Sequence, residues 1–105
     1  MKVKIRENSP FGKLASKKLK AKSVAIVFGN TIHLWGASKE EFLKNPYWVR
    51  HELEHINQYK NYGFFNFIFL YLLETFKRGY YKNKFEELAR NKEKESLNLN
   101  EIEFI

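Results

Sequence analysis

Two short runs of β-branched and aromatic residues, at 23–28 and 31–35, follow each other in the first third of the chain. Gly29 and Asn30 separate them. A two-residue loop of this composition is typical of the type I′ or II′ turn that joins antiparallel strands. The pattern therefore predicts a β-hairpin made of these two runs.

A helical pattern begins after a start signal at Asn45 and Pro46. Asparagine is a favoured N-cap residue, and proline suits the first helical position because no backbone donor is needed there. We expect this helix to run to about Lys60 and to end at Gly63, since glycine commonly follows a helix C-terminus.

The residues after Gly63 are almost entirely apolar and predict a second helix, from Phe64 to about Lys77, that ends at Gly79. Its apolar run, up to Phe76, is 13 residues long, whereas roughly 20 are needed to cross a bilayer. We therefore predict a helix buried in the protein rather than one that enters a membrane.

Two capping-box spacings mark other helical segments. Ser38 followed by Glu41 predicts a short helical turn, and Asn83 followed by Glu86 predicts the start of a third helix with the sequence KFEELARNKEK. The tail from Ser96 is polar with a few apolar residues, and this pattern does not determine its structure. A hairpin followed by helices indicates an α+β fold, and 105 residues are enough for a single domain with a modest core.

Positive charge is concentrated at one end. Residues 1–22 hold eight of the 19 Lys and Arg residues but one acid, whereas the rest of the chain has equal numbers of both signs. We interpret residues 1–22 as a basic N-terminal arm, a candidate for contact with an anionic membrane surface or nucleic acid. The alternative is a solvated basic helix after Ser9 and Pro10, because aromatic residues are not interleaved with the basic ones.

The start of the chain is charged at every second position and lacks the apolar core of a signal peptide, which favours a cytoplasmic location, peripheral to a membrane at most. The absence of cysteine excludes disulfides, thiolate metal ligands and a thiol nucleophile. All twelve acidic residues are glutamates, so any carboxylate ligand comes from that set.

The first predicted helix contains the sequence HELEH at residues 51–55. At about 100° per residue, His51, His55 and Gln58 share one face of this helix. The opposite face carries apolar residues that can pack on a core: Val49, Leu53 and Ile56.

Two histidines four residues apart can supply two neighbouring corners of a tetrahedral zinc site. Glu52 lies close enough on the helical wheel to accept a proton from a water activated by the metal. Glu54 flanks His51 equally on its other side, so the wheel does not choose between the two glutamates. The alternative without a metal is an exposed polar helix face.

A hydrolytic zinc site usually has three protein ligands. His33 is on the predicted hairpin, where we expect a partly exposed strand residue rather than a ligand. The downstream carboxylates remain as candidates: Glu74, Glu86 and Glu87.

The segments RHELEHINQYKNYGFFNFIFLYLLE and GYYKNKFEELAR resemble the zincin-type metallopeptidases of the gluzincin branch, in particular short His-Glu-x-x-His domains of bacterial proteins. Such domains continue with an apolar helix and a Gly-Tyr-x-x-Asn-Pro-Phe-Glu-x-Glu-Ala signature. The resemblance covers roughly residues 12–92. Lys84 stands where the signature has proline, and Leu88 where it has its second glutamate.

The resemblance implies that His51 and His55 bind zinc, that Glu52 is the general base and that Glu86 is the third ligand, as in a Glu-x-x-Ala motif. The residues alone also fit a purely structural role for Glu86. It lies three positions after the predicted N-cap Asn83, as in a capping box, and it could form an ion pair with Arg90.

Three more side chains are candidates for supporting roles. Gln58 is either a partner of a ligand histidine or a buried amide with its own hydrogen bonds. Glu74 is either a hydrogen-bond partner of a ligand histidine or half of an ion pair with Lys77 or Arg78. Tyr80 could donate its hydroxyl to a developing oxyanion, although aromatic packing also accounts for it.

The resemblance thus implies a small α+β zincin-like domain, with a hairpin or small sheet, an active-site helix and two further helices. The implied function is that of a zinc-dependent metallopeptidase that cleaves amide bonds in a peptide or protein substrate. The alternative is a non-catalytic metal-binding or interaction module that docks through the basic arm, since the chain lacks a second lobe to wall a cleft.

Overall fold

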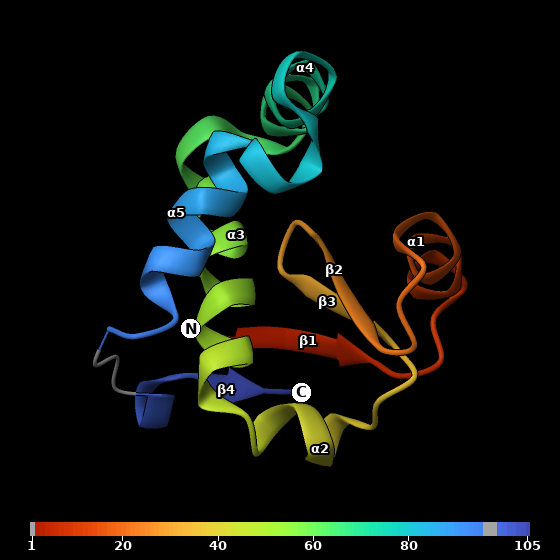
Figure 1. The fold of residues 1–105 in the computed structure, drawn as a ribbon. Coiled ribbons are helices and arrows are strands. Elements are labelled where there is room, and N and C mark those ends of the chain that lie inside the picture. Colours follow the sequence, from red (N-terminus) through yellow and green to blue (C-terminus); the bar gives the residue numbers. More distant parts are fainter. Residues whose placement is uncertain (1, 96–98) are drawn as a thin grey trace.

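A mixed four-stranded sheet lies at the centre of the computed structural model, which describes residues 2–95 and 99–105 (Figure 1). The strand order is β2-β3-β1-β4. The strands are β1 (Lys2–Arg6), β2 (Val24–Phe28), β3 (Thr31–Trp35) and β4 (Glu103–Phe104). The α+β class predicted from the sequence is confirmed.

Helices cover both faces of the sheet (Figure 1). Helix α3 and the helices next to it lie on one face, and α1 lies on the other. The α-helices are α1 (Pro10–Leu19), α2 (Lys39–Leu43), α3 (Pro46–Tyr62), α4 (Phe64–Lys82) and α5 (Lys84–Lys92), and a 3₁₀ turn covers Leu99–Glu101.

Local signals placed most of these elements correctly. Strands β2 and β3 pair antiparallel around Gly29, which has a left-handed φ of 64°. The Ser38 capping box forms at the start of α2, and the Asn45 side chain accepts a hydrogen bond from the backbone N–H of Trp48 at the start of α3. Gly63 ends α3 as predicted. Each of these signals acts within a few residues, so neighbouring sequence is sufficient to read it.

Two strands were not predicted. β1 lies between β3 and β4 and is parallel to both, with Val3 fully buried. Residues 1–22 were predicted to be a basic arm. From residue 2 to residue 19 this segment is instead an integral part of the fold, as β1 and α1, although its basic side chains are exposed. Residues 96–98, at the start of the tail whose structure the sequence pattern leaves open, lie outside the described residues.

Helix α1 packs closely on β3. A Cβ atom on the buried Gly12 would lie 3.0 Å from the backbone carbon of Leu34, so glycine permits this approach. Beside it, Ser9 Oγ and His33 Nδ1 are 2.8 Å apart. His33 is buried, and the prediction of a partly exposed strand residue is wrong because α1 covers that side of the sheet.

The main core lies between the other face of the sheet and α3. Val49, Leu53 and Ile56, the apolar face predicted for the helix, are all buried there. They pack in one cluster with residues of the sheet and of the other helices: Val3, Val27, Ile32, Leu34, Phe42, Phe67 and Phe85. The polar face of α3 therefore points toward α4 and α5.

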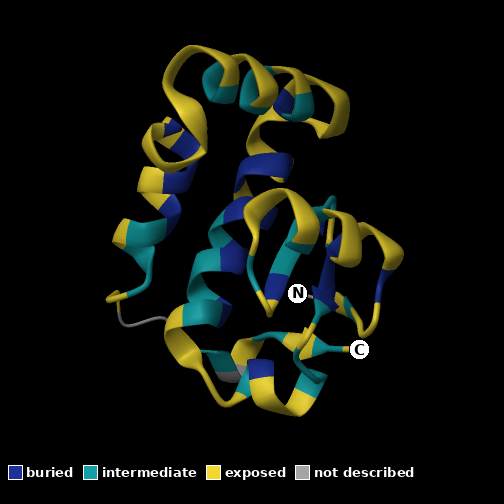
Figure 2. Ribbon diagram, turned by 45° about the vertical axis from the view of Figure 1, so that its right-hand side comes forward, coloured by how far each residue is buried: buried dark blue, intermediate teal, exposed yellow. Residues whose placement is uncertain are grey.

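Helix α4 differs from its prediction. It was predicted to be buried, but Phe67 is its only buried residue, and most of its outer surface is exposed (Figure 2). The backbone leaves the helical conformation at Gly79 (φ 81°, ψ 166°), where the sequence predicted the end, and a last turn follows to Lys82. No helix of the described residues is long and apolar enough to cross a membrane.

Candidate metal centre

Helix α3 presents His51 and His55 away from its apolar core face, at a cavity that is also lined by β2. Helix α5 packs against α3, and the buried Asn83 fixes where α5 begins. Its Oδ1 accepts from the backbone N–H of Phe85, and its Nδ2 donates to the carbonyl of Tyr71 and to Thr75 Oγ1. This buried amide joins the start of α5 to α4.

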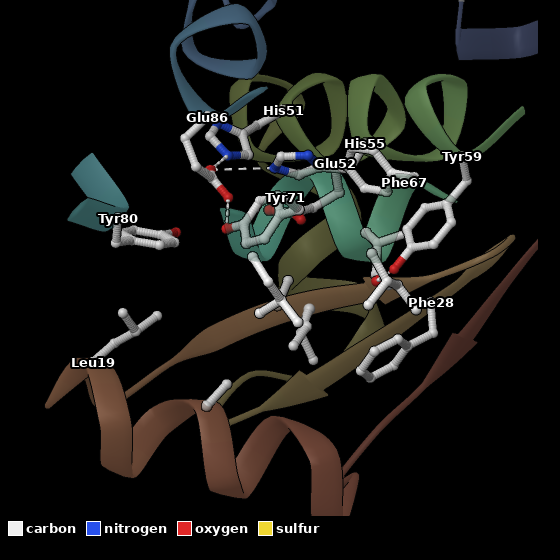
Figure 3. A pocket seen from close by; sticks show the side chains of 16 residues that line it. Leu19, Phe28, His51, Glu52, His55, Tyr59, Phe67, Tyr71, Tyr80 and Glu86 are labelled. Carbon is white, nitrogen blue, oxygen red and sulfur yellow. Dashed lines mark hydrogen bonds and ion pairs between the residues drawn. The ribbon is translucent and has the colours of Figure 1, made fainter. Parts of the chain in front are cut away.

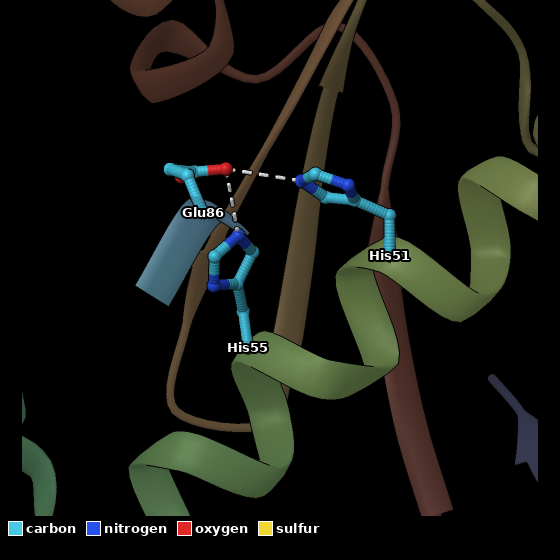
Figure 4. A group of neighbouring side chains, drawn as sticks. All are labelled: His51, His55 and Glu86. Carbon is cyan, nitrogen blue, oxygen red and sulfur yellow. Dashed lines mark hydrogen bonds and ion pairs between the residues drawn. The ribbon is translucent and has the colours of Figure 1, made fainter. Parts of the chain in front are cut away.

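Glu86, in the first turn of α5, points at the two histidines (Figure 4). Its Oε1 is 3.0 Å from His51 Nε2 and 3.2 Å from His55 Nε2. One ligand atom from each of the three residues lies within 4.8 Å of the others. The structure therefore brings together the three predicted metal ligands.

The alternative roles of the downstream glutamates fit the structure less well. Glu86 is buried and directed at the histidines, while the Arg90 guanidinium donates to the Tyr81 carbonyl and stacks over its ring. Glu87 is exposed. Among the three candidates, Glu86 alone joins the histidine cluster in the described residues.

Each histidine has a second contact at its other ring nitrogen. His51 Nδ1 lies 2.8 Å from Glu93 Oε2, and His55 Nδ1 lies 2.9 Å from Gln58 Oε1. Since the amide Nε2 of Gln58 donates to Glu54 and to the Phe85 carbonyl, its oxygen is the atom that faces His55. These acceptors favour a proton on both Nδ1 atoms, which directs both Nε2 atoms to a shared ligand.

The charges in this cluster perturb each other. Burial lowers the pKa of His51, but the hydrogen bond to Glu86, the charge of Glu52 and the hydrogen bond to Glu93 outweigh it and raise that pKa to about 9. Burial raises the pKa of Glu86, but hydrogen bonds from both histidines hold it well below its usual range. The cluster therefore favours an ionised Glu86 carboxylate beside protonated, positively charged histidines.

Glu52 is buried on the side of α3 that faces a cavity and does not join the three-residue cluster. Burial raises its pKa to about 7, and the charges of His55 and His51 offset part of this rise. Glu54, which the helical wheel could not separate from Glu52, instead accepts a hydrogen bond from Gln58. Only the packing around the helix distinguishes the two glutamates.

The cavity has a volume of about 340 Å³ and lies between β2, α1, α3 and α4 (Figure 3). His51, Glu52, His55 and Glu86 form its polar end. The rest of its wall is mainly apolar or aromatic: Ala15, Leu19, Ala25, Ile26, Val27, Phe28, Tyr59, Phe67, Ile68, Tyr71, Leu72 and Tyr80. A cavity of this size, with a small polar end and perturbed carboxylates, is typical of a site for a small ligand or a few residues of a peptide.

The supporting candidates have different outcomes. Gln58 combines its two alternatives, because its oxygen contacts His55 while its amide nitrogen donates to Glu54 and to the Phe85 carbonyl. Tyr80 lines the cavity. Glu74 does not contact a histidine. It pairs with Arg78 at 3.1 Å and accepts a hydrogen bond from the backbone N–H of Lys84, so the ion-pair alternative holds.

Two contacts of the site were missed by sequence reasoning. The first is the contact of Glu93 with His51. Glu93 lies seven residues after Glu86, two helical turns away on the same side, and this spacing could have predicted the contact. Tyr71 donates its hydroxyl to Glu86 Oε2 across two helices. No local pattern reveals that contact, because it depends on how α4 packs against α5.

Comparison with protein-family models, with curated proteins and with solved structures finds no match to this chain. The convergence of two imidazoles and a carboxylate beside a second buried carboxylate is therefore the principal clue to the function of the protein.

Proposed function

We propose that the protein is a zinc-dependent hydrolase, most specifically a metallopeptidase. The observation that carries this proposal is the meeting of His51, His55 and Glu86 at one end of a cavity that Glu52 also lines. The resemblance of its sequence to zincin-type metallopeptidases supports the same function.

The chemistry of the donor set fits zinc. Two imidazole nitrogens and one carboxylate oxygen are a ligand combination of catalytic zinc sites, which leave a fourth position open. The outer contacts of His51 and His55 at Nδ1 favour Nε2 as the coordinating atom of each ring. Tyr71 holds the second oxygen of Glu86, which leaves Oε1 toward the histidines.

A zinc ion held by these residues would polarise a substrate carbonyl and lower the pKa of a coordinated water toward 7. Glu52 is the carboxylate of the same cavity that lies outside the ligand cluster. In this proposal it accepts the proton of the attacking water and returns it to the departing amine, first as general base and then as general acid.

The remaining lining residues bind the substrate and exclude water. The apolar walls contributed by β2 and α4 suit an apolar side chain next to the bond that is cleaved. Tyr80 extends toward the polar end of the cavity and is placed to donate to a developing oxyanion (Figure 3).

The first test is zinc affinity, measured by competition with a chromophoric chelator. We expect one zinc per chain, with affinity at least about a hundredfold weaker in His55→Ala and Glu86→Gln, because removing a ligand leaves only two. Glu87→Gln is the matched control, since this exposed neighbour on α5 lies outside the cluster.

A peptidase assay then separates catalysis from metal binding. We expect Glu52→Gln to bind zinc like the native chain and to lose peptide hydrolysis. If the native chain does not bind zinc, the proposal fails. If it binds zinc but cleaves no substrate in a broad peptide library, the non-catalytic metal-binding alternative replaces the peptidase.

A further inference from the structure

Helix α4 carries an exposed apolar stripe. Phe65, Phe69, Leu72 and Phe76 lie within about 60° of one another around the helix, and their exposed fractions are 83%, 63%, 61% and 90%. In most surface helices the apolar stripe faces the core. Here Phe67 provides the buried contact, whereas the four residues of the stripe are exposed. Figure 2 shows that most of this helix is exposed.

Positive charge accompanies this stripe. Helices α1 and α4 together contain six basic residues and a single acid, Glu74, which is paired with Arg78. Phe11 and Leu14 of α1 are also exposed, and so are the three lysines of this helix. The two helices thus combine apolar and cationic groups on the surface of a chain with a net charge of +7.

The same two helices form the sides of the cavity. Figure 1 views both close to end-on, with the β2-β3 hairpin between them. Leu19 of α1 and Leu72 of α4 line the cavity and are 42% and 61% exposed, so they belong to its rim. The apolar stripe of α4 therefore continues to the mouth of the cavity.

We propose that α4 docks this protein on the surface of an anionic lipid bilayer. Its apolar stripe enters the boundary between headgroups and acyl chains, and the lysines of α1 and the basic residues of α4 contact the headgroups. Aromatic and aliphatic residues on one side, with Lys and Arg beside them, are the composition of helices that lie in the membrane interface. Each exposed basic residue near the surface adds to the attraction.

A second copy of the chain fits this surface less well. At about 200 Å² for a fully exposed large side chain, the exposed fractions of its four side chains add up to roughly 600 Å² of accessible surface. A stable interface needs about 800 Å² from each partner. Two copies, each with a charge of +7, would also repel each other, whereas an anionic bilayer attracts them.

Docking in this orientation brings the cavity mouth to the bilayer surface. Together with the proposed function, on which this step rests, the orientation implies that the substrates are peptide segments lying at a membrane surface. The docking itself requires neither metal nor catalysis, because α4 and α1 act through exposed residues outside the His51, His55 and Glu86 cluster.

The test is flotation of the full chain, in the presence of a chelator, with vesicles of phosphatidylcholine alone or mixed with phosphatidylglycerol. We expect binding to the anionic vesicles, and partitioning at least about tenfold weaker for the Phe69→Ser/Phe76→Ser variant, since two apolar anchors are lost. Tyr47→Ser/Leu88→Ser, which removes two exposed apolar residues on α3 and α5, is the matched control and should bind like the native chain.

A second variant keeps the proposal testable if the phenylalanine variant does not fold. Lys17→Glu/Lys18→Glu leaves the stripe intact and should weaken binding to anionic vesicles while binding to neutral vesicles stays the same. The proposal is overturned if the native chain does not bind anionic vesicles, or if Phe69→Ser/Phe76→Ser binds them as well as the control Tyr47→Ser/Leu88→Ser does. It is also overturned if sedimentation velocity shows a dimer that the phenylalanine substitutions dissociate. Because the chelator removes any metal, a negative flotation result does not bear on zinc binding. Equally, a chain that does not bind zinc can still dock on the bilayer.

Discussion

Raising the pH should destabilise the metal-free protein. His51 has a folded pKa of about 9 against an ordinary value of 6.5, so between these values the folded chain holds more protons than the unfolded chain. Its stabilising contribution is fully present below pH 6.5 and is lost as the pH rises through 9. For this group alone, the free energy of unfolding should fall by about 2 kcal/mol between pH 7 and pH 9.

Other groups in the site do not reverse this sign. The pKa of His55 is also raised, chiefly because hydrogen bonding and charge from Glu86 outweigh the effect of burial. The pKa of His33 is lowered by burial and by the charge of Arg6, so its effect is confined to lower pH. Glu52, whose pKa burial raises to about 7, adds a smaller decrease of the same sign just above pH 7. Most of the decrease between pH 7 and pH 9 therefore reports the histidines that contact Glu86.

Urea unfolding of the full chain with a chelator, at pH 7 and at pH 9, measures this effect. Glu86→Gln is the informative control, because it removes the carboxylate that both histidines contact, and it should lose most of the decrease. A native chain whose stability is level or rises over this range would refute the reasoning. So would a Glu86→Gln variant that loses stability as steeply as the native chain.

Two further substitutions test the site and the fold. Tyr71→Phe removes the hydroxyl that donates to Glu86 and should weaken zinc binding ten- to a hundredfold, roughly the effect of losing a contact to a metal ligand; unchanged affinity in the chelator competition would contradict this. Gly36→Ala adds a Cβ that would lie 1.9 Å from the Lys22 carbonyl oxygen, at a φ of 80°. It should destabilise the protein by at least about 2 kcal/mol in urea unfolding, and a loss below about 1 kcal/mol would contradict the close approach.

The candidate site shows how far sequence reasoning reaches. The spacing of His51 and His55 places both on one side of a helix, and the structure confirms this arrangement. The third residue of the cluster was chosen by resemblance rather than by spacing, because Glu74 and Glu87 were equally available on nearby turns. The structure separates them because the first turn of α5 packs against α3, where Gln58 Nε2 donates to the carbonyl of Phe85, the neighbour of Glu86.

The sequence by itself determined the elements whose signals are local. The hairpin turn, the caps of α2 and α3 and the apolar face of α3 each depend on residues within about four positions of one another. Their hydrogen bonds join residues that are close in sequence, so the local pattern is enough to predict them.

Only the tertiary structure decided which residues these elements meet. β1 pairs with strands about 30 and 100 residues away, and α4 leaves its stripe exposed because the sheet and α3 already fill the core around Phe67. Glu52 faces the cavity while Glu54 does not, since that depends on which elements pack beside α3. Contacts between distant segments depend on the shape of the whole domain, and a local pattern carries no information about that shape.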